Sequence, residues 1–297
     1  MRSRIEARSI GGILDDVFRQ YRKYFGPLFL ISLVFLAPII ILDSFVSSQV
    51  PTLQYQALLS GHTTISQFFQ STHTTTASII EGIGALIVSL LSMNVSSPLT
   101  EGAYYALAQD TLVHDRTRPS PWRYVRLAVS RWGAYLATLW LLIGLTVLLF
   151  AVLIGIAALI GMTHSAALGG LFSIVSFIIA IAFIWLAIRL LFVFAAVFLE
   201  RKRNWGAIAR SYRLTAGSFW RIFGILVISY LVLGFAAAGL GAVFNLVLPL
   251  NVLSVVGSGL VSILLAPLFN LLVANLYLDL RVRREGYEVD LEETTDD

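Results

Sequence analysis

Long apolar stretches alternate with short polar segments along the whole chain. A lipid bilayer has a hydrocarbon core of about 30 Å, which takes about 20 mostly apolar helical residues to cross. Six stretches meet this length closely enough: 28–47, 79–95, 133–161, 168–199, 219–243 and 252–280. The alternation of apolar and polar residues expected of barrel strands is absent, and helices satisfy their own backbone groups in lipid. The pattern therefore predicts an all-α, polytopic membrane helix bundle with six transmembrane helices.

A weak repeat organises these crossings into three units. Each unit is predicted to hold an amphipathic interfacial helix, a crossing, an outer loop and a second crossing. In the first unit Leu14, Val17 and Tyr21 are expected on the apolar face, with Asp16 and Gln20 on the polar face. The interfacial helices of the next two units are expected at 120–132 and 205–217, and Trp, Tyr and Phe mark their apolar faces. Basic residues opposite aromatic rings suit the headgroup layer of a membrane.

The basic residues of these three helices are candidate contacts for lipid headgroups. They are Arg19, Arg22, Lys23, Arg123, Arg126, Arg131, Arg210, Arg213 and Arg221. Two interpretations remain open: the helices act only as topological anchors, or they bind anionic lipid or a partner.

Composition supports the membrane assignment. The 297 residues are 58% hydrophobic and only 13% charged, with a mean hydropathy of +0.83, whereas soluble domains carry about 25% charged residues. This excludes an ordinary soluble enzyme and a disordered chain. The chain has no cysteine, which excludes disulfides and thiolate metal sites. We expect a single transmembrane domain over 1–284 and an acidic, disordered tail over 285–297.

The placement of Lys and Arg predicts the orientation. Twenty of the 21 basic residues lie in the N-terminal segment, the loops around 116–131 and 201–221, or the C-terminal tail, and the other three loops have none. By the positive-inside rule, both termini are expected in the cytoplasm, and the composition fits a bacterial plasma membrane. A net charge of +4 distributed in this way reflects topology and does not indicate nucleic-acid binding.

A few polar residues inside the crossings are candidates for an intramembrane site, because burying them in lipid is costly. Arg189 lies in the fourth crossing. It is either near mid-bilayer with a partner, for which Asp279 and Glu101 are candidates, or at a helix end with its side chain reaching the headgroups. Asn270 and Asn275 in the sixth crossing are expected to hydrogen-bond between helices.

No pattern of catalytic or cofactor-binding residues stands out. The four histidines are His62, His73, His114 and His164, and they are isolated from one another and from carboxylates at metal-ligand spacing. Glycine-rich phosphate loops and serine nucleophile motifs are absent. We therefore expect no cofactor and no metal, and we hold an enzymatic activity to be the weakest hypothesis.

Three segments resemble a known family. They are 10–26 (IGGILDDVFRQYRKYFG), 211–220 (SYRLTAGSFW) and 276–286 (LYLDLRVRREG), and they are similar to the membrane domain of glycerophosphoryl diester phosphodiesterases. In the fused members a separate soluble barrel performs hydrolysis, and this chain has no counterpart of its His-Arg-Gly start. The resemblance thus implies the membrane part alone, for which the family has no assigned activity.

These observations favour a non-enzymatic membrane scaffold or lipid-interacting protein whose partners are membrane lipids, including anionic ones. The alternative is a transporter or channel for a small solute, and a minor alternative is an accessory protein of glycerophospholipid metabolism. A homo-oligomer is compatible with the sequence.

Overall fold

The computed structural model describes residues 9–47, 76–113, 120–162, 166–247 and 251–285. Within these ranges all regular secondary structure is helical and there is no strand, so the all-α prediction is confirmed. Six of the helical segments are long and apolar enough to cross a membrane, as expected. The loop at 48–75, the four histidines and nearly all of the acidic tail lie outside the described residues.

The helices follow one another with few breaks. In chain order they are α1 (Ile10–Lys23), α2 (Phe25–Ser47), α5 (Thr76–Leu91), the π-helix η1 (Ser92–Ser96), α6 (Ser97–Val113), α7 (Pro121–Met162), α8 (Ala166–Leu190), α9 (Val193–Glu200), α10 (Asn204–Thr215), α11 (Phe219–Val247) and α12 (Asn251–Glu285).

Only two of the three predicted interfacial helices are separate elements. α1 ends at Lys23 and is capped by Tyr24, and α10 is followed by Gly217, whose φ of 71° is a left-handed conformation that suits glycine. The second predicted helix has no such break before Gly133, so α7 continues through 42 residues from Pro121. The prediction of a separate interfacial helix at 120–132 is therefore wrong.

Two crossings are broken where the sequence predicts one continuous helix. The second crossing runs from α5 through η1 into α6, which extends well beyond the predicted end at Val95. The fourth is divided into α8 and α9, and the break follows directly after Leu190. Arg189 thus lies in the last turn of a helix, which is the second of the two placements considered for it.

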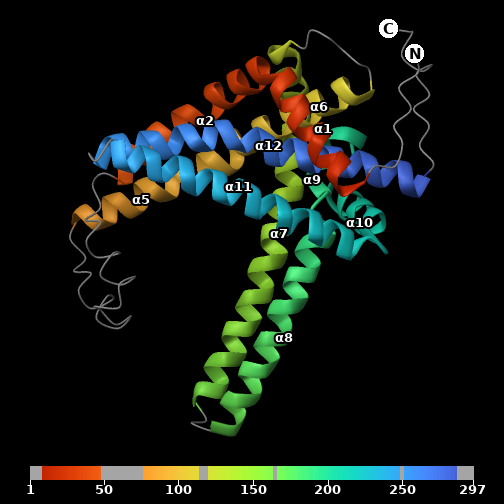
Figure 1. The fold of residues 1–297 in the computed structure, drawn as a ribbon. Helices are drawn as coiled ribbons and strands as arrows, with labels where there is room; N and C mark the ends of the chain where they lie inside the picture. The colour runs from red at the N-terminus through yellow and green to blue at the C-terminus, as the bar shows by residue number, and fades with distance from the viewer. Residues whose placement is uncertain (1–8, 48–75, 114–119, 163–165, 248–250, 286–297) are drawn as a thin grey trace.

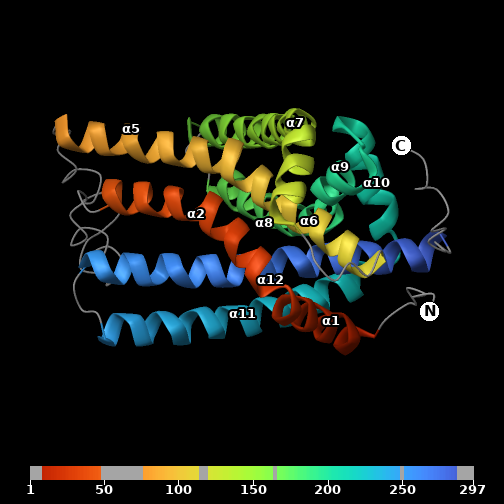
Figure 2. The same cartoon turned by 90° about the horizontal axis from the view of Figure 1, so that it is seen from above.

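Three helical hairpins diverge from a common buried base. They are formed by α2 with α5, α7 with α8, and α11 with α12, and the α7–α8 hairpin points away from the other two (Figure 1). Seen from above, α12 lies beside α2 and α11 (Figure 2). The second half of α12 is the centre of the packing, because it also contacts α1, α6, α9 and α10.

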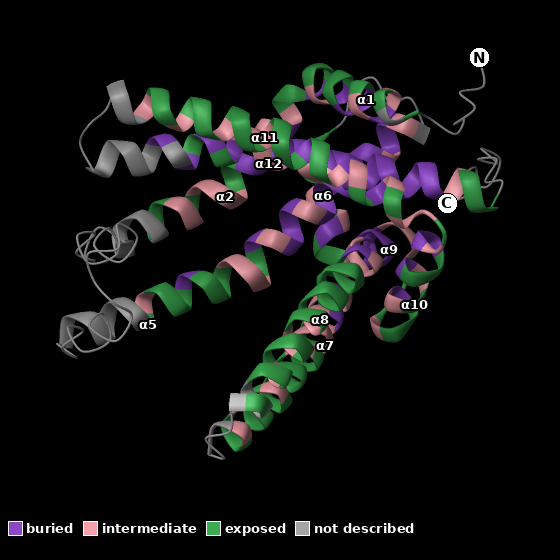
Figure 3. Cartoon of the chain, turned by 60° about the horizontal axis from the view of Figure 1, so that its bottom comes forward, coloured by how far each residue is buried: buried purple, intermediate pink, exposed green. Residues whose placement is uncertain are grey.

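Burial is concentrated at the basic end of the bundle. In the most apolar 18-residue stretch of α12, 61% of the residues are buried, whereas none are buried in that of α7. Figure 3 shows the same gradient, with buried residues where α6, α9 and α12 meet and exposed ones along α7 and α8. Apolar side chains exposed along a helix of this length are the expected surface toward lipid. We call the buried end the base.

Close helix contact at the base depends on Gly102 in α6. A Cβ added there would lie 2.4 Å from the Phe198 ring of α9 and 2.9 Å from Ala128 of α7. Phe198 itself packs against the rings of Tyr105 and Tyr135. The small residue therefore lets three helices meet.

Candidate functional site

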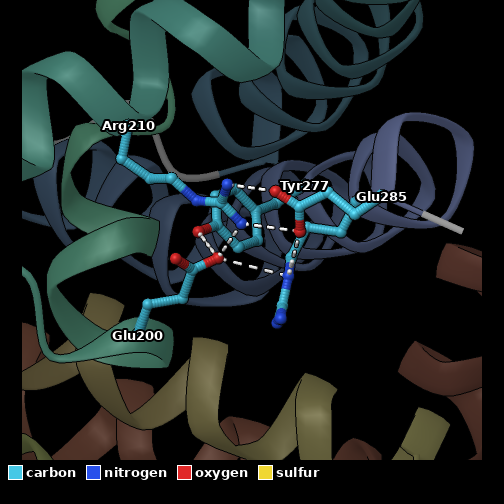
Figure 4. A network of polar contacts seen from close by, with 5 residues as sticks. Glu200, Arg210, Tyr277 and Glu285 are labelled. Carbon is cyan, nitrogen blue, oxygen red and sulfur yellow. Dashed lines mark hydrogen bonds and ion pairs between the residues drawn. The ribbon is translucent and has the colours of Figure 1, made fainter. Parts of the chain in front are cut away.

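An ion-pair network joins α9, α10 and α12 at the base. Glu200, the last residue of α9, accepts hydrogen bonds from Arg210 at 2.6 Å and from the hydroxyl of Tyr277 at 2.6 Å, and it lies 3.2 Å from Arg281. Arg210 also donates to both carboxylate oxygens of Glu285, at 2.8 Å for one of them. Figure 4 shows these side chains converging on one another. Since the charges neutralise each other within the protein, this network is a structural element.

Two of the predicted headgroup contacts belong to such internal pairs. The hydrogen bonds that Arg210 donates to Glu285 and Glu200 raise the pKa of its guanidinium, and its side chain is only 13% exposed. Arg221 at the start of α11 pairs with the buried Asp279 at 2.9 Å, and Asp279 also accepts from Arg283 at 3.0 Å. These arginines hold α10 and α11 against α12.

The remaining candidate headgroup contacts differ in their surroundings. Arg19 pairs with Asp16, and Arg123 lies 3.5 Å from Asp110. Lys23 lies over the ring of Tyr24. The other exposed members form no ion pair among the described residues: Arg22, Arg126 and Arg213. Arg131 lines a hollow that is described below.

The intramembrane candidates are bound within the protein. Arg189 donates to the Tyr212 carbonyl at 3.3 Å and lies between the rings of Trp185 and Tyr212, whose centroids are 4.9 and 4.7 Å away. The expected partners of Arg189 are wrong, because Asp279 pairs with Arg221 and Arg283, and Glu101 bonds to Tyr135.

The two asparagines differ in their roles. Asn275 joins α12 to α1 by donating to Gln20 at 2.9 Å, as expected of a bond between helices. Asn270 bonds only to Ala266 of its own helix in the described chain. The Gln20 contact also overturns the predicted faces of α1, because Gln20 and Asp16 are buried together with Ile13 and Val17.

A groove with three arginines lies beside this network, on the α7 side of the base. It has a volume of about 600 Å³ and is lined by Arg131, Arg201 and Arg203, together with small and apolar residues of α7 and α9. No acidic side chain lines it, and within the described ranges none of the three arginines forms an ion pair. We call it the arginine groove.

The loop that supplies two of these arginines has an unusual backbone. Arg201 and Asn204 have φ values of 54° and 46°, a left-handed conformation that costs energy in residues other than glycine. Two contacts hold the loop in place: Lys202 N–H donates to the Ala196 carbonyl at 3.2 Å, and Asn204 N–H donates to Thr138 Oγ1 at 2.9 Å. The loop is thus fixed to α9 and α7, and Arg201 and Arg203 face the groove from a defined position.

A second, smaller hollow adjoins the arginine groove. It has a volume of about 150 Å³ and shares Leu127 and Arg131 with the groove. Its polar lining comes from Gln109, Asp110, Arg123 and Tyr124, and Tyr124 donates to Asp110 at 2.9 Å. We call it the polar hollow.

Exposed tryptophans lie toward the base, where the arginine groove is. The chain has six, all exposed: Trp122, Trp132, Trp140, Trp185, Trp205 and Trp220. They lie in the first half of α7, the end of α8, α10 and the start of α11, all toward the base. Tryptophan prefers the boundary between lipid and water, and Arg131 and Gly133, the neighbours of Trp132, line the arginine groove.

The chemistry available at this site is binding of an anion. Three guanidinium groups without carboxylate partners match the oxygens of a phosphate. The described part of the chain holds no group of three His, Asp or Glu side chains able to bind a metal. Sequence reasoning included Arg131 but missed Arg201 and Arg203, which it counted only as charges of a loop. The available signal was a run of three basic residues directly before Asn204.

Comparisons with known proteins give one family. The model of a domain of unknown function, DUF7847, matches residues 29–280. No curated protein and no solved structure matches the chain. Nothing in these findings links it to glycerophosphoryl diester phosphodiesterases, so that resemblance stays a prediction. Since the matched region covers all six candidate spans except a few terminal residues, the chain belongs to the DUF7847 family.

Proposed function

We propose that this protein is a non-enzymatic, lipid-binding scaffold of the plasma membrane, which holds the phosphate of an anionic lipid in the arginine groove. The observation that carries the proposal is the set of Arg131, Arg201 and Arg203 around a groove of about 600 Å³ with no acidic lining. Other arginines of the base, such as Arg210, are already neutralised by carboxylates. The groove combines a cavity with three arginines that have no acidic partner among the described residues.

The position of the groove supports a lipid rather than a soluble anion. Beyond the residues that line the groove, α7 continues as an exposed apolar helix. Acyl chains would lie along this helix. Each basic residue close to an anionic membrane surface contributes about 1 kcal/mol, reduced by screening. Three fixed arginines therefore supply enough free energy to enrich an anionic lipid at the protein.

The proposal also includes the orientation. Twenty of the 21 basic residues lie in the N-terminal segment, the loops around 116–131 and 201–221, or the C-terminal tail, and the positive-inside rule puts such segments in the cytoplasm. The cytoplasmic leaflet is the one rich in anionic lipids. A groove that binds anionic headgroups would thus face the leaflet that contains them.

The test compares two triple variants with the same loss of charge. The first carries Arg131→Gln, Arg201→Gln and Arg203→Gln in the groove. The second carries Arg22→Gln, Arg126→Gln and Arg213→Gln, all exposed positions outside it. Both are purified from the same membranes, and native mass spectrometry counts retained phosphatidylglycerol and phosphatidic acid against phosphatidylcholine in matched nanodiscs.

We expect the groove variant to lose about tenfold in retained anionic lipid, which corresponds to about 1.4 kcal/mol, and the control variant to lose much less. Equal losses in the two variants would mean that lipid responds to total charge and not to the groove. Unchanged retention in both would contradict lipid binding altogether.

Transport of a small solute is a second candidate, and the two broken crossings favour it. Transporters often interrupt helices near the bilayer centre, and here the breaks are η1 and the junction of α8 with α9. In η1, however, Asn94 is already bonded to Trp132 and Trp140. If the groove variant retains lipid normally, a solute-uptake assay in proteoliposomes becomes the next experiment.

A further inference from the structure

We infer that the lipid held at this site carries a short polyol, such as glycerol, on its phosphate, and that the polar hollow recognises the polyol. The inference rests on the proposed function and specifies its ligand. It comes from the position, the lining and the charge of the hollow beside the arginine groove.

The two cavities lie in the order that such a headgroup needs. The polar hollow contacts α7 at Arg123, Tyr124, Leu127 and Arg131, whereas the groove contacts it from Leu127 to Ala134. At 1.5 Å per residue, the hollow is centred about one turn nearer to the start of α7. It is therefore on the aqueous side of the phosphate site, where the terminal group of a phospholipid lies.

The lining of the hollow suits hydroxyl groups. Gln109 offers an amide that can both donate and accept, and it has no hydrogen bond to another described residue. Asp110 accepts from Tyr124 and Arg123, so its carboxylate is already engaged in the wall of the hollow. A vicinal diol can donate to the amide oxygen of Gln109 and accept from its NH₂ group at the same time.

Charge argues against an amine headgroup. The two cavities together contain four arginines and one carboxylate: Arg123, Arg131, Arg201, Arg203 and Asp110. Arg123 lies 3.5 Å from Asp110, so an ammonium group entering the hollow would meet a like charge. A neutral polyol avoids this repulsion.

Size argues against a bare phosphate. The hollow of about 150 Å³ has room for about five water molecules at about 30 Å³ each, or for one glycerol group. Phosphatidic acid would fill the arginine groove and leave the hollow to water. A polyol replaces those waters and makes hydrogen bonds of its own.

The experiment measures headgroup choice in the full-length protein. Nanodiscs contain equal fractions of phosphatidylglycerol, phosphatidic acid and phosphatidylserine, and native mass spectrometry counts each lipid retained. We expect the wild type to prefer phosphatidylglycerol over phosphatidic acid by about three- to tenfold, the gain from one or two hydrogen bonds. A site that responded to charge alone would prefer phosphatidic acid, which carries more negative charge.

Two variants separate the polyol from the phosphate. Gln109→Leu removes the amide at similar volume, and Ala106→Leu, which also lines the hollow, fills it. Both are expected to reduce the ratio of phosphatidylglycerol to phosphatidic acid to about one and to leave retained phosphatidic acid unchanged. Gly144→Ala on α7 is the control, because a Cβ there meets nothing within 4 Å.

The outcomes distinguish this inference from the proposed function. Equal retention of both anionic lipids by the wild type would overturn the polyol inference alone, provided that the groove variant still loses both. A groove variant that loses neither would overturn both. If soluble glycerophosphoglycerol saturates the protein at micromolar concentration without a bilayer, the ligand class stands and its membrane source is wrong.

Discussion

At the scale of single residues, the arginines of the base differ by what neutralises them. Arg210 and Arg221 are paired with Glu200, Glu285 and Asp279, whereas Arg131 and Arg201 face a groove without acids. The sequence shows where these residues occur along the chain, but pairing depends on which helices meet. The same residue type therefore holds helices together in one place and lines a groove without acidic side chains in another.

Removing the charge of Glu200 tests the cohesive role. In Glu200→Gln the guanidinium groups of Arg210 and Arg281 lose a carboxylate that is only 12% exposed. Breaking a buried ion pair from one side costs about 3 kcal/mol, and we expect a loss of this size in the free energy of unfolding. Denaturation of the purified protein in mixed micelles measures it, with Arg213→Gln, exposed and outside the network, as the control. A loss equal to that of the control would contradict the structural role of the network.

Adding one methyl group at Gly102 tests the packing of the base. The Cβ of Gly102→Ala would overlap the ring of Phe198, which is held by Tyr105 and Tyr135 and has little room to move. Overpacking of this kind costs about 2 kcal/mol. We expect a lower midpoint of thermal unfolding for this variant, whereas Gly144→Ala in the open part of α7 should leave it unchanged or raise it.

At the scale of elements, the predicted crossings are observed, whereas the interruptions within two of them were not predicted. Apolar length is a local property, so the six spans follow from the sequence. The polar face of α1 does not, because Gln20 becomes buried only when Asn275 of α12 supplies a partner. The division of the fourth crossing is equally non-local: Ser211 of α10 donates to the Arg189 carbonyl and accepts from Phe192 N–H at the break.

The π-helix η1 gives a prediction at this scale. Two tryptophans of α7 bond to Asn94: Trp132 donates to its carbonyl at 2.6 Å and Trp140 to its side chain at 2.9 Å. In Trp132→Phe with Trp140→Phe both bonds are lost at similar apolar area, at about 1 kcal/mol each. We expect faster backbone amide exchange in η1 and the adjoining turns, measured by mass spectrometry. If amide exchange in η1 of the double variant stays at the wild-type rate, α7 does not hold the π-helix.

At the scale of the whole molecule, three hairpins share one base; α2 and α12 also pack against each other beyond it, whereas the α7–α8 hairpin points away. The positive-inside rule predicts that the basic segments lie on one side of the membrane. The exposed tryptophans also lie toward the base. The arginine groove could not be predicted from that pattern, because it needs α7 and the loop after α9 side by side. The left-handed φ of Arg201 that positions its side chain also leaves no sequence signal.

Single cysteines test the orientation of the molecule, since the chain has none of its own. We expect Ser60→Cys and Ser165→Cys, in the connections α2–α5 and α7–α8, to react with an impermeant thiol reagent added to intact cells. Ser120→Cys, directly before α7, should react only after the cells are opened. Labelling of Ser120→Cys from outside intact cells would contradict the predicted orientation or the six-crossing arrangement.

The central place of α12 has a consequence for biosynthesis. Of the described helices, α12 is the last to leave the ribosome, and yet α1, α2, α6, α9, α10 and α11 all pack on it. During translation the earlier hairpins must therefore wait in the bilayer with Glu200, Arg210 and Gln20 lacking their partners from α12. Ribosomes stalled before residue 251 would expose this unfinished state to quality-control proteases, and completion of α12 would end that exposure in one step.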